Sequence, residues 1–202
     1  MKGKIIEIAK TLSLEETALS IIEFNEQNLS DYRKSHILQV SYFSYHLAVR
    51  ENQENDDLHK KSFLAAMLHD CTKERKPQFH YDLFKKHGVE EKYSGFPVPV
   101  LHSKSAGLFA QDQFSIRDPE IDEAISCHTT GKIDMSNLAQ ILYAGDYLGS
   151  LEFEAAQSSF NENDLSSLCL EKVKKSMTHL VKANHTIHPD TFEYYNSLAG
   201  KS

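Results

Sequence analysis

Apolar residues recur along most of the chain at steps of three and four positions, which is the spacing of one face of an α-helix. The stretch 30–50 illustrates this stripe, with steps of four, three and four: His36, Val40, Phe43 and Leu47. Runs that alternate between apolar and polar residues, as strands do, are short and compete poorly with the helical spacing. The pattern therefore predicts an all-α fold.

Capping residues, glycine and proline mark the ends of the expected helices. Ser13 and Glu16 match a capping box at the start of the second helix. Asp118 followed by Pro119 is a common helix start, and Gly88 is expected to end a helix. The expected helices cover 4–10, 13–27, 30–50, 57–71, 79–87, 99–113, 118–128, 135–147, 151–157 and 164–182, and a last one follows residue 189.

Length and composition fit one globular domain, because the chain has 202 residues, of which 40% are hydrophobic and 25% charged. We therefore expect residues 1–202 to form a single helical bundle, in which a core of about 30–150 is flanked by N- and C-terminal helices. The net charge of −7 gives no electrostatic basis for binding nucleic acid or an anionic membrane. The apolar runs are too short to cross a bilayer, so no membrane association is expected.

The cysteines indicate a reducing compartment. Cys71, Cys127 and Cys169 are odd in number and form no paired motif, so no disulfide framework is expected. No signal-peptide pattern is present near the first residues, and we expect a cytoplasmic protein. The sequence leaves the oligomeric state open, a homodimer included.

Four histidines and two aspartates fall on the inward faces of different expected helices: His36, His69, Asp70, His102, His128 and Asp146. A buried carboxylate without a partner is costly, so each aspartate needs a cation or strong donors nearby. Imidazole and carboxylate ligands without cysteine favour iron, manganese or zinc at a catalytic site. Six ligands are too many for one open ion and suit two ions, with Asp70 as the bridging, catalytic carboxylate.

A site with two metal ions suits hydrolysis of a phosphoester or phosphoanhydride. A hydroxide between the ions attacks phosphorus, while the metals take up charge on the phosphate oxygens. Lys73 is a second candidate catalytic residue, which would neutralise the transition state or the leaving phosphate. Arg33 is expected to contact phosphate. Hydroxyl and backbone donors to the same phosphates are expected from Thr129, Thr130 and Gly131.

The segment 74–100 is the least regular part of the chain. It lies between stretches that carry the candidate ligands, which is a common place for a lid over substrate. A loop that only covers core surface explains the same pattern. The sequence leaves both interpretations open.

Five short motifs carry the candidate residues over about 30–150. They are Arg33 to His36, Leu68-His69-Asp70-Cys71-Thr72-Lys73, Val100-Leu101-His102 with Ser105-Ala106, His128-Thr129-Thr130-Gly131, and Gly145-Asp146-Tyr147. In order and approximate spacing these motifs resemble the HD-domain phosphohydrolases. Within that group they look most like the YqeK type, the symmetrical bis(5′-nucleosyl)-tetraphosphatases of bacteria.

The resemblance implies an HD-domain helical bundle whose metal-site core spans about 30–150. It implies a centre of two divalent or trivalent metal ions, iron first and manganese or zinc as alternatives, held by the six residues named above. The implied reaction is hydrolysis of diadenosine tetraphosphate into two ADP, with a nucleotide as the binding partner. Arg33 and Lys73 would contact the phosphates.

One segment departs from the family pattern. After the Asp-Tyr pair the family usually continues with Ile-Glu-Pro and an arginine soon after, whereas 148–152 reads Leu-Gly-Ser-Leu-Glu. The departure keeps two alternatives open: a phosphohydrolase that acts on another nucleotide or phosphoester, and a nucleotide-binding regulatory module with little turnover. A purely structural helical protein is a third.

Overall fold

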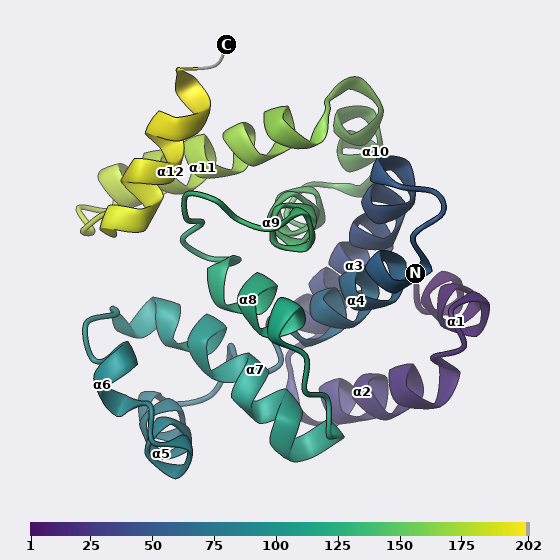
Figure 1. Cartoon of the computed structure of the whole chain (residues 1–202), viewed down its shortest axis with the longest axis horizontal. Coiled ribbons are helices and arrows are strands. Elements are labelled where there is room, and N and C mark those ends of the chain that lie inside the picture. The colour runs from purple at the N-terminus through teal and green to yellow at the C-terminus, as the bar shows by residue number, and fades with distance from the viewer. Residues whose placement is uncertain (201–202) are drawn as a thin grey trace.

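The chain folds into helices throughout residues 1–200, which are the residues that the computed structural model describes (Figure 1). The elements are α1 (Lys2–Thr11), α2 (Glu15–Asn28), α3 (Asp31–Glu51), α4 (Asp56–Leu68), α5 (Pro77–His87), α6 (Glu90–Tyr93), the 3-10 helix η1 (Val98–Val100), α7 (Leu101–Phe114), α8 (Pro119–Cys127), α9 (Asn137–Gly149), α10 (Phe153–Glu162), α11 (Leu165–Lys182) and α12 (Pro189–Ala199). The predicted all-α class is confirmed. Among these helices, none has the length and apolar composition that crossing a membrane requires.

Helix α9 lies in the middle of the arrangement, and Figure 1 shows it nearly end-on. Helices α3, α4, α8 and α11 pack around it. Its side chains Leu138, Ile141 and Leu142 are buried, and each fully buried side chain of this size contributes about 1.5–3 kcal/mol. Helix α9 therefore joins the N-terminal helices to α11 and, through α11, to α12.

Two glycines let α9 approach α3 closely. A methyl group built on Gly145 would lie 2.1 Å from Oγ of Ser44, and one built on Gly149 would lie 2.3 Å from Cγ2 of Val40. The glycines are four residues apart and so share one face of α9. This contact sets the distance between the two helices.

The helix ends confirm some capping predictions and contradict one. Asp118 accepts hydrogen bonds from two backbone N–H groups at the start of α8, and Gly88, with φ of 65°, ends α5. The capping box predicted at Ser13 is wrong. Ser13 has φ of 59°, and Leu14 precedes the first turn of α2 without a side-chain cap.

The fourth helix ends at Leu68, whereas the sequence pattern placed its end at residue 71. A series of tight turns follows, in which the N–H of Cys71 donates to the carbonyl of Leu68 and the N–H of Lys73 to that of Asp70. The His-Asp doublet therefore lies in a turn just after the helix. Both side chains remain buried there.

The segment 74–100 contains α5, α6 and η1, and it packs against α7. Phe84, Tyr93 and Leu101 form a small apolar cluster of their own, separate from the main core. The segment thus covers one side of α7.

We predict that Gly149→Ala lowers the free energy of unfolding by about 1–3 kcal/mol, because the new methyl group would overpack the contact with α3. Gly3→Ala in α1 is the matched control, since a methyl group there meets no atom within 4 Å. This control variant should keep the free energy of unfolding of the unmodified protein, or raise it by up to about 1 kcal/mol, because alanine has a higher helix propensity than glycine. Thermal unfolding followed by circular dichroism measures both. Equal unfolding temperatures of the two variants would contradict the close approach of α3 and α9.

Candidate metal centre

The six candidate ligands lie together although separate segments carry them. One each comes from α3, α7, α9 and the end of α8, and two come from the turn after α4: His36, His102, Asp146, His128, His69 and Asp70. The four histidines and Asp70 are at most 7% exposed, and the Asp146 side chain is 20% exposed. The fold therefore brings together the cluster that the sequence pattern singled out.

A backbone carbonyl oxygen lies 2.7–3.0 Å from Nδ1 of each of these four histidines. A carbonyl oxygen only accepts hydrogen bonds, so Nδ1 carries the proton and, in the neutral ring, Nε2 carries a lone pair. The four pairs are His36 with Gly149, His69 with Ala66, His102 with Pro99, and His128 with Ile125. Each ring is thus held by the backbone with the same nitrogen free.

The free nitrogens converge in pairs. Nε2 of His36 lies 3.4 Å from Nε2 of His69, and Nε2 of His102 lies 3.2 Å from Nε2 of His128. Oδ1 of Asp146 belongs to the first pair, since it lies 2.9 Å from Nε2 of His36. Atoms that carry lone pairs therefore face one another in a buried space.

Asp70 lies between the two pairs and faces both of them. Its Oδ1 is 3.2 Å from Nε2 of His102 and 3.5 Å from Nε2 of His128. Its Oδ2 is 3.6 Å from Nε2 of His69 and 3.8 Å from Nε2 of His36. One carboxylate thus spans two groups of imidazoles.

Burial and the neighbouring groups together set the protonation of these side chains. It lowers the pKa of His69 and of His102 to about 3, so both rings are neutral at pH 7. For Asp70, burial opposes ionisation, but the polar groups around the carboxylate outweigh burial and hold its pKa well below the usual range. His36 differs, because the hydrogen bond and the charge of Asp146 outweigh burial and raise its pKa.

The donor set fits cations. Ligand atoms of two groups lie within 4.8 Å of one another, His36 with His69 and Asp146, and His69 with Asp70 and His128. Among residues 1–200, no hydrogen-bond donor reaches Oδ1 of Asp70, although this oxygen is buried. A buried anionic oxygen that faces bare imidazole nitrogens is costly unless a cation lies between them. The nitrogen and oxygen atoms are those that iron, manganese and zinc accept.

Three of the expected phosphate contacts lie beside this cluster. The Arg33 guanidinium pairs with Oδ2 of Asp70. Nζ of Lys73 lies 3.0 Å from Nε2 of His102, and burial lowers the pKa of this lysine. Oγ1 of Thr129 lies 3.2 Å from Nε2 of His128. These groups surround the cluster with hydrogen-bond donors.

The other two expected contacts have different positions. Oγ1 of Thr130 is buried and has no hydrogen-bond partner within residues 1–200. The N–H of Gly131 already donates to the carbonyl of Cys127, at 2.8 Å. Gly131 has φ of 68°, and a methyl group on it would lie 2.5 Å from the Tyr194 ring. It therefore shapes the turn after α8, where only glycine fits.

Lys172, a buried residue of α11, also belongs to the site, although the sequence pattern did not single it out. Its Nζ lies 2.6 Å from Oδ2 of Asp146 and 2.6 Å from the backbone oxygen of His128. The ammonium also lies over the Tyr143 ring, 4.0 Å from its centroid. One signal was present in the sequence, because Lys172 stands four residues after Leu168 on the apolar stripe of its helix.

A cavity of about 350 Å³ adjoins the cluster. On the side of the cluster it is lined by Lys73, Thr129 and Thr130, and on the other side by residues of α11 and α12 and of the loop between them, His179 and His188 among them. We call it the C-terminal cavity. It is large enough for a small organic ligand, since ligand pockets begin near 300 Å³.

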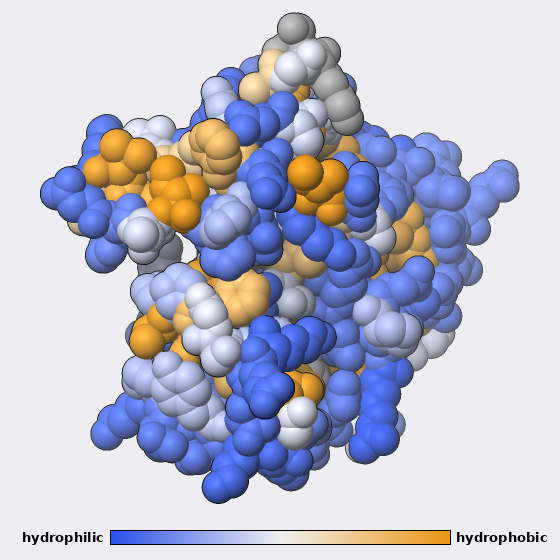
Figure 2. Space-filling view, turned by 60° about the vertical axis from the view of Figure 1, so that its left-hand side comes forward, coloured by the Kyte–Doolittle hydropathy of each residue, from blue (hydrophilic) through white to orange (hydrophobic). Residues whose placement is uncertain are grey.

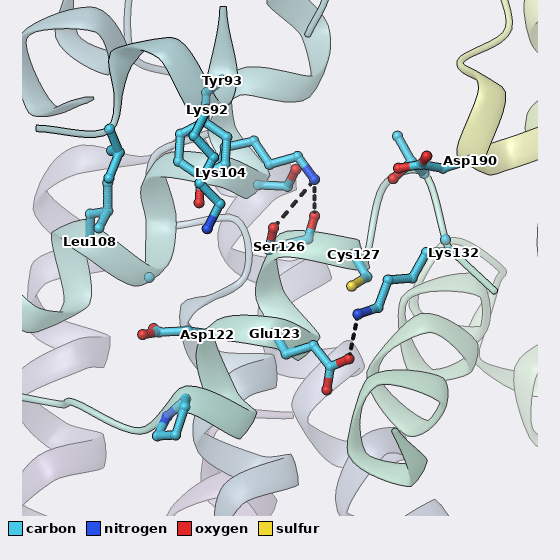
Figure 3. Close-up of a pocket in the computed structure, with 16 residues that line it drawn as sticks. Lys92, Tyr93, Lys104, Leu108, Asp122, Glu123, Ser126, Cys127, Lys132 and Asp190 are labelled. Carbon is cyan, nitrogen blue, oxygen red and sulfur yellow. Dashed lines mark hydrogen bonds and ion pairs between the residues drawn. The ribbon is translucent and has the colours of Figure 1, made fainter. Parts of the chain in front are cut away.

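A second cavity, of about 480 Å³, lies between α6, α7, α8 and the start of α12. Figure 3 shows its charged side chains, two of which, Lys104 and Lys132, have neighbouring partners among the residues drawn. Nζ of Lys104 donates to the carbonyl of Ser126 at 2.6 Å, and Lys132 pairs with Glu123 at 2.7 Å. We call it the charged cavity. It shares Thr130 with the C-terminal cavity but has none of the six candidate ligands in its lining.

Comparison with known proteins gives related sequences and a related structure. The HD domain family model matches residues 33–151. A symmetrical bis(5′-nucleosyl)-tetraphosphatase of Bacillus subtilis is 26% identical over 190 residues, which cover 93% of this chain and 98% of that protein. The protein of the same name from Halalkalibacterium halodurans is 25% identical over 180 residues, covering 88% and 94%. The crystal structure of a predicted HD superfamily hydrolase involved in NAD metabolism, from Clostridium acetobutylicum, is similar with a TM-score of 0.75 at 24% identity, covering 90% and 96%.

We predict that Lys172→Met lowers the free energy of unfolding of the metal-free protein by about 3–5 kcal/mol, because it leaves the carboxylate of Asp146 without its cation. Lys175→Met on the same helix is the control. Lys175 is exposed and donates to Ser150, so its loss should change stability by less than about 0.5 kcal/mol. Urea denaturation measures both values. Similar losses in the two variants would contradict the buried ion pair.

Proposed function

The chain belongs to the HD-domain family, and we propose that it is a metal-dependent hydrolase that splits diadenosine tetraphosphate symmetrically into two ADP. The observation that supports the metal dependence is the set of four imidazoles whose free nitrogens face two carboxylates. The names of the relatives from Bacillus subtilis and Halalkalibacterium halodurans support the choice of substrate.

We assign the six clustered residues to two metal ions. Asp70 would contact both ions, because its two oxygens face different pairs of histidines. The remaining residues would divide between the ions, with His36, His69 and Asp146 on one side and His102 and His128 on the other. Such a pair of ions supplies a hydroxide nucleophile at neutral pH and neutralises charge on the phosphate oxygens.

The protein's own donors would hold and orient the polyphosphate. Lys73, whose Nζ lies beside His102, would donate to phosphate oxygens and offset the charge that develops on them. Nε of Arg33 is buried and has no partner within the described chain, so it is a donor for a phosphate oxygen. Thr129 adds a hydroxyl next to His128.

The segment 148–152, which departs from the family pattern, holds ligand-bearing helices together. The carbonyl of Gly149 accepts from Nδ1 of His36. Nε2 of Gln39 donates to the carbonyls of Leu148 and Leu151, at 3.3 and 2.8 Å. This segment therefore fixes α3 against the end of α9, and the positions of the candidate ligands do not depend on an arginine there.

Product analysis tests the proposed function. The protein is incubated with diadenosine tetraphosphate and manganese or iron(II), and the products are separated by chromatography. We expect ADP alone. Asp70→Asn should reduce the rate at least about 100-fold. Replacing a residue that only hydrogen-bonds to a metal ligand already lowers metal affinity or activity about 10- to 100-fold. Asp57→Asn, at an exposed position of α4, is the control and should keep the rate of the unmodified protein.

Other products would contradict parts of this assignment. ATP together with AMP would rule out symmetrical cleavage while keeping the hydrolase. A folded, metal-loaded protein that binds the dinucleotide without cleaving it would favour a regulatory module. Cleavage of other phosphoesters alone would move the assignment to another substrate.

A further inference from the structure

The C-terminal cavity begins where the candidate metal centre ends. Lys73 and Thr129 line it, and the same two residues contact His102 and His128 of the centre. Symmetrical cleavage leaves two phosphates between the broken bond and each nucleoside. A substrate whose middle lies at the centre must therefore place a nucleoside beside the centre, in a space of this kind.

The walls of this cavity suit a flat, uncharged group. Pro97, Pro99 and Leu180 provide apolar surface, and the imidazoles of His179 and His188 provide rings on which a base can stack. No acidic side chain lines the cavity within residues 1–200. Figure 2 shows a hollow in one face of the molecule, with apolar side chains on its borders.

A ring contact joins the two walls of the cavity. The Phe96 ring stacks on the ring of His188, with centroids 4.7 Å apart and an angle of 9° between the planes. Phe96 precedes η1, whereas His188 caps the start of α12. Segments far apart in the sequence thus meet at the cavity, and the C-terminal part lies beyond the residues that the family model matches.

One buried hydroxyl in this lining lacks a partner. Thr130 is 3% exposed, and its Oγ1 has no hydrogen-bond partner within the described chain. A buried hydroxyl without a partner costs free energy, which a ligand that bonds to it would recover. The hydroxyls of a ribose are partners of this kind.

The charged cavity is a poorer place for the same group. Asp122, Glu123 and Asp190 line it, and their charges would repel the phosphates attached to a nucleoside. Its two buried or half-buried lysines, Lys104 and Lys132, already have partners. Of the two cavities that border Thr130, the C-terminal cavity is the one that suits a nucleotide.

We propose that the C-terminal cavity binds one nucleoside of the substrate, with the Thr130 hydroxyl as a hydrogen-bond partner and His179 in the wall beside the base. This inference rests on the proposed function, since it takes the polyphosphate to lie at the metal centre. It assigns to α11 and α12 a part in choosing nucleotides over other phosphate compounds.

Calorimetric titration with two probes tests the inference. The manganese-loaded protein is titrated with ADP and with pyrophosphate, which carries the two phosphates without the nucleoside. We expect Thr130→Val to weaken ADP binding about 3- to 10-fold, the effect of one hydrogen bond. His179→Ala should weaken it at least about 5-fold through lost stacking. Binding of pyrophosphate should change less than 2-fold in both variants.

One control variant and one stability measurement separate a binding role of Thr130 from a structural role. Thr178→Val makes the same chemical change at an exposed position of α11 and should leave both affinities unchanged. Because the Thr130 hydroxyl has no partner in the free protein, Thr130→Val should keep or raise the unfolding temperature. A lowered unfolding temperature would instead assign Thr130 a structural role, and His179→Ala would then decide the role of the cavity.

Several results would overturn the inference. Equal losses for ADP and pyrophosphate would place the effect at the phosphates, and unchanged ADP binding in both variants would exclude the nucleoside from the cavity. If the unmodified protein bound ADP no more tightly than pyrophosphate, the nucleoside would likewise be excluded from the cavity. Failure of the proposed function is distinguished separately, because it would appear as the absence of ADP among the products of the unmodified protein.

Discussion

The site depends on one repeated hydrogen bond, from Nδ1 of a histidine to a backbone carbonyl oxygen. Four imidazoles make this bond, and three of them make it to the carbonyl three residues earlier: His69, His102 and His128. The bond fixes the tautomer, so the opposite nitrogen of each neutral ring offers a lone pair. Helices that end or begin at these histidines then aim the free nitrogens at the same two carboxylates.

The scaffold that holds these groups extends beyond the residues that the HD domain family model matches. Gly145 and Gly149 allow α9 to approach α3, which brings Asp146 within 2.9 Å of His36. From the other side, Lys172 of α11 holds the second oxygen of Asp146. The family model ends at residue 151, so the buried cation and the cavity walls that α11 supplies lie outside the residues that it matches.

Much of the architecture was predictable from helical spacing, because a stripe of apolar positions shows both a helix and its buried face. The same spacing predicted that the side chains of His36 and Asp146 face the core. Asp70 was expected on a helix, but the chain leaves the helix at Leu68, and spacing does not show where tertiary contacts end a helix. Lys172 was missed because its partners lie far away in the sequence, and a lysine near an apolar stripe usually reaches solvent with its ammonium.

In the proposed site, the six clustered residues hold two metal ions. Titration of the metal-free protein with manganese(II), with free ion counted by electron paramagnetic resonance, tests it directly. We expect two bound ions per chain, and a loss of both when Asp70 is replaced by alanine, because this carboxylate faces both groups of imidazoles. Binding of no ion, or two ions that persist without Asp70, would contradict it.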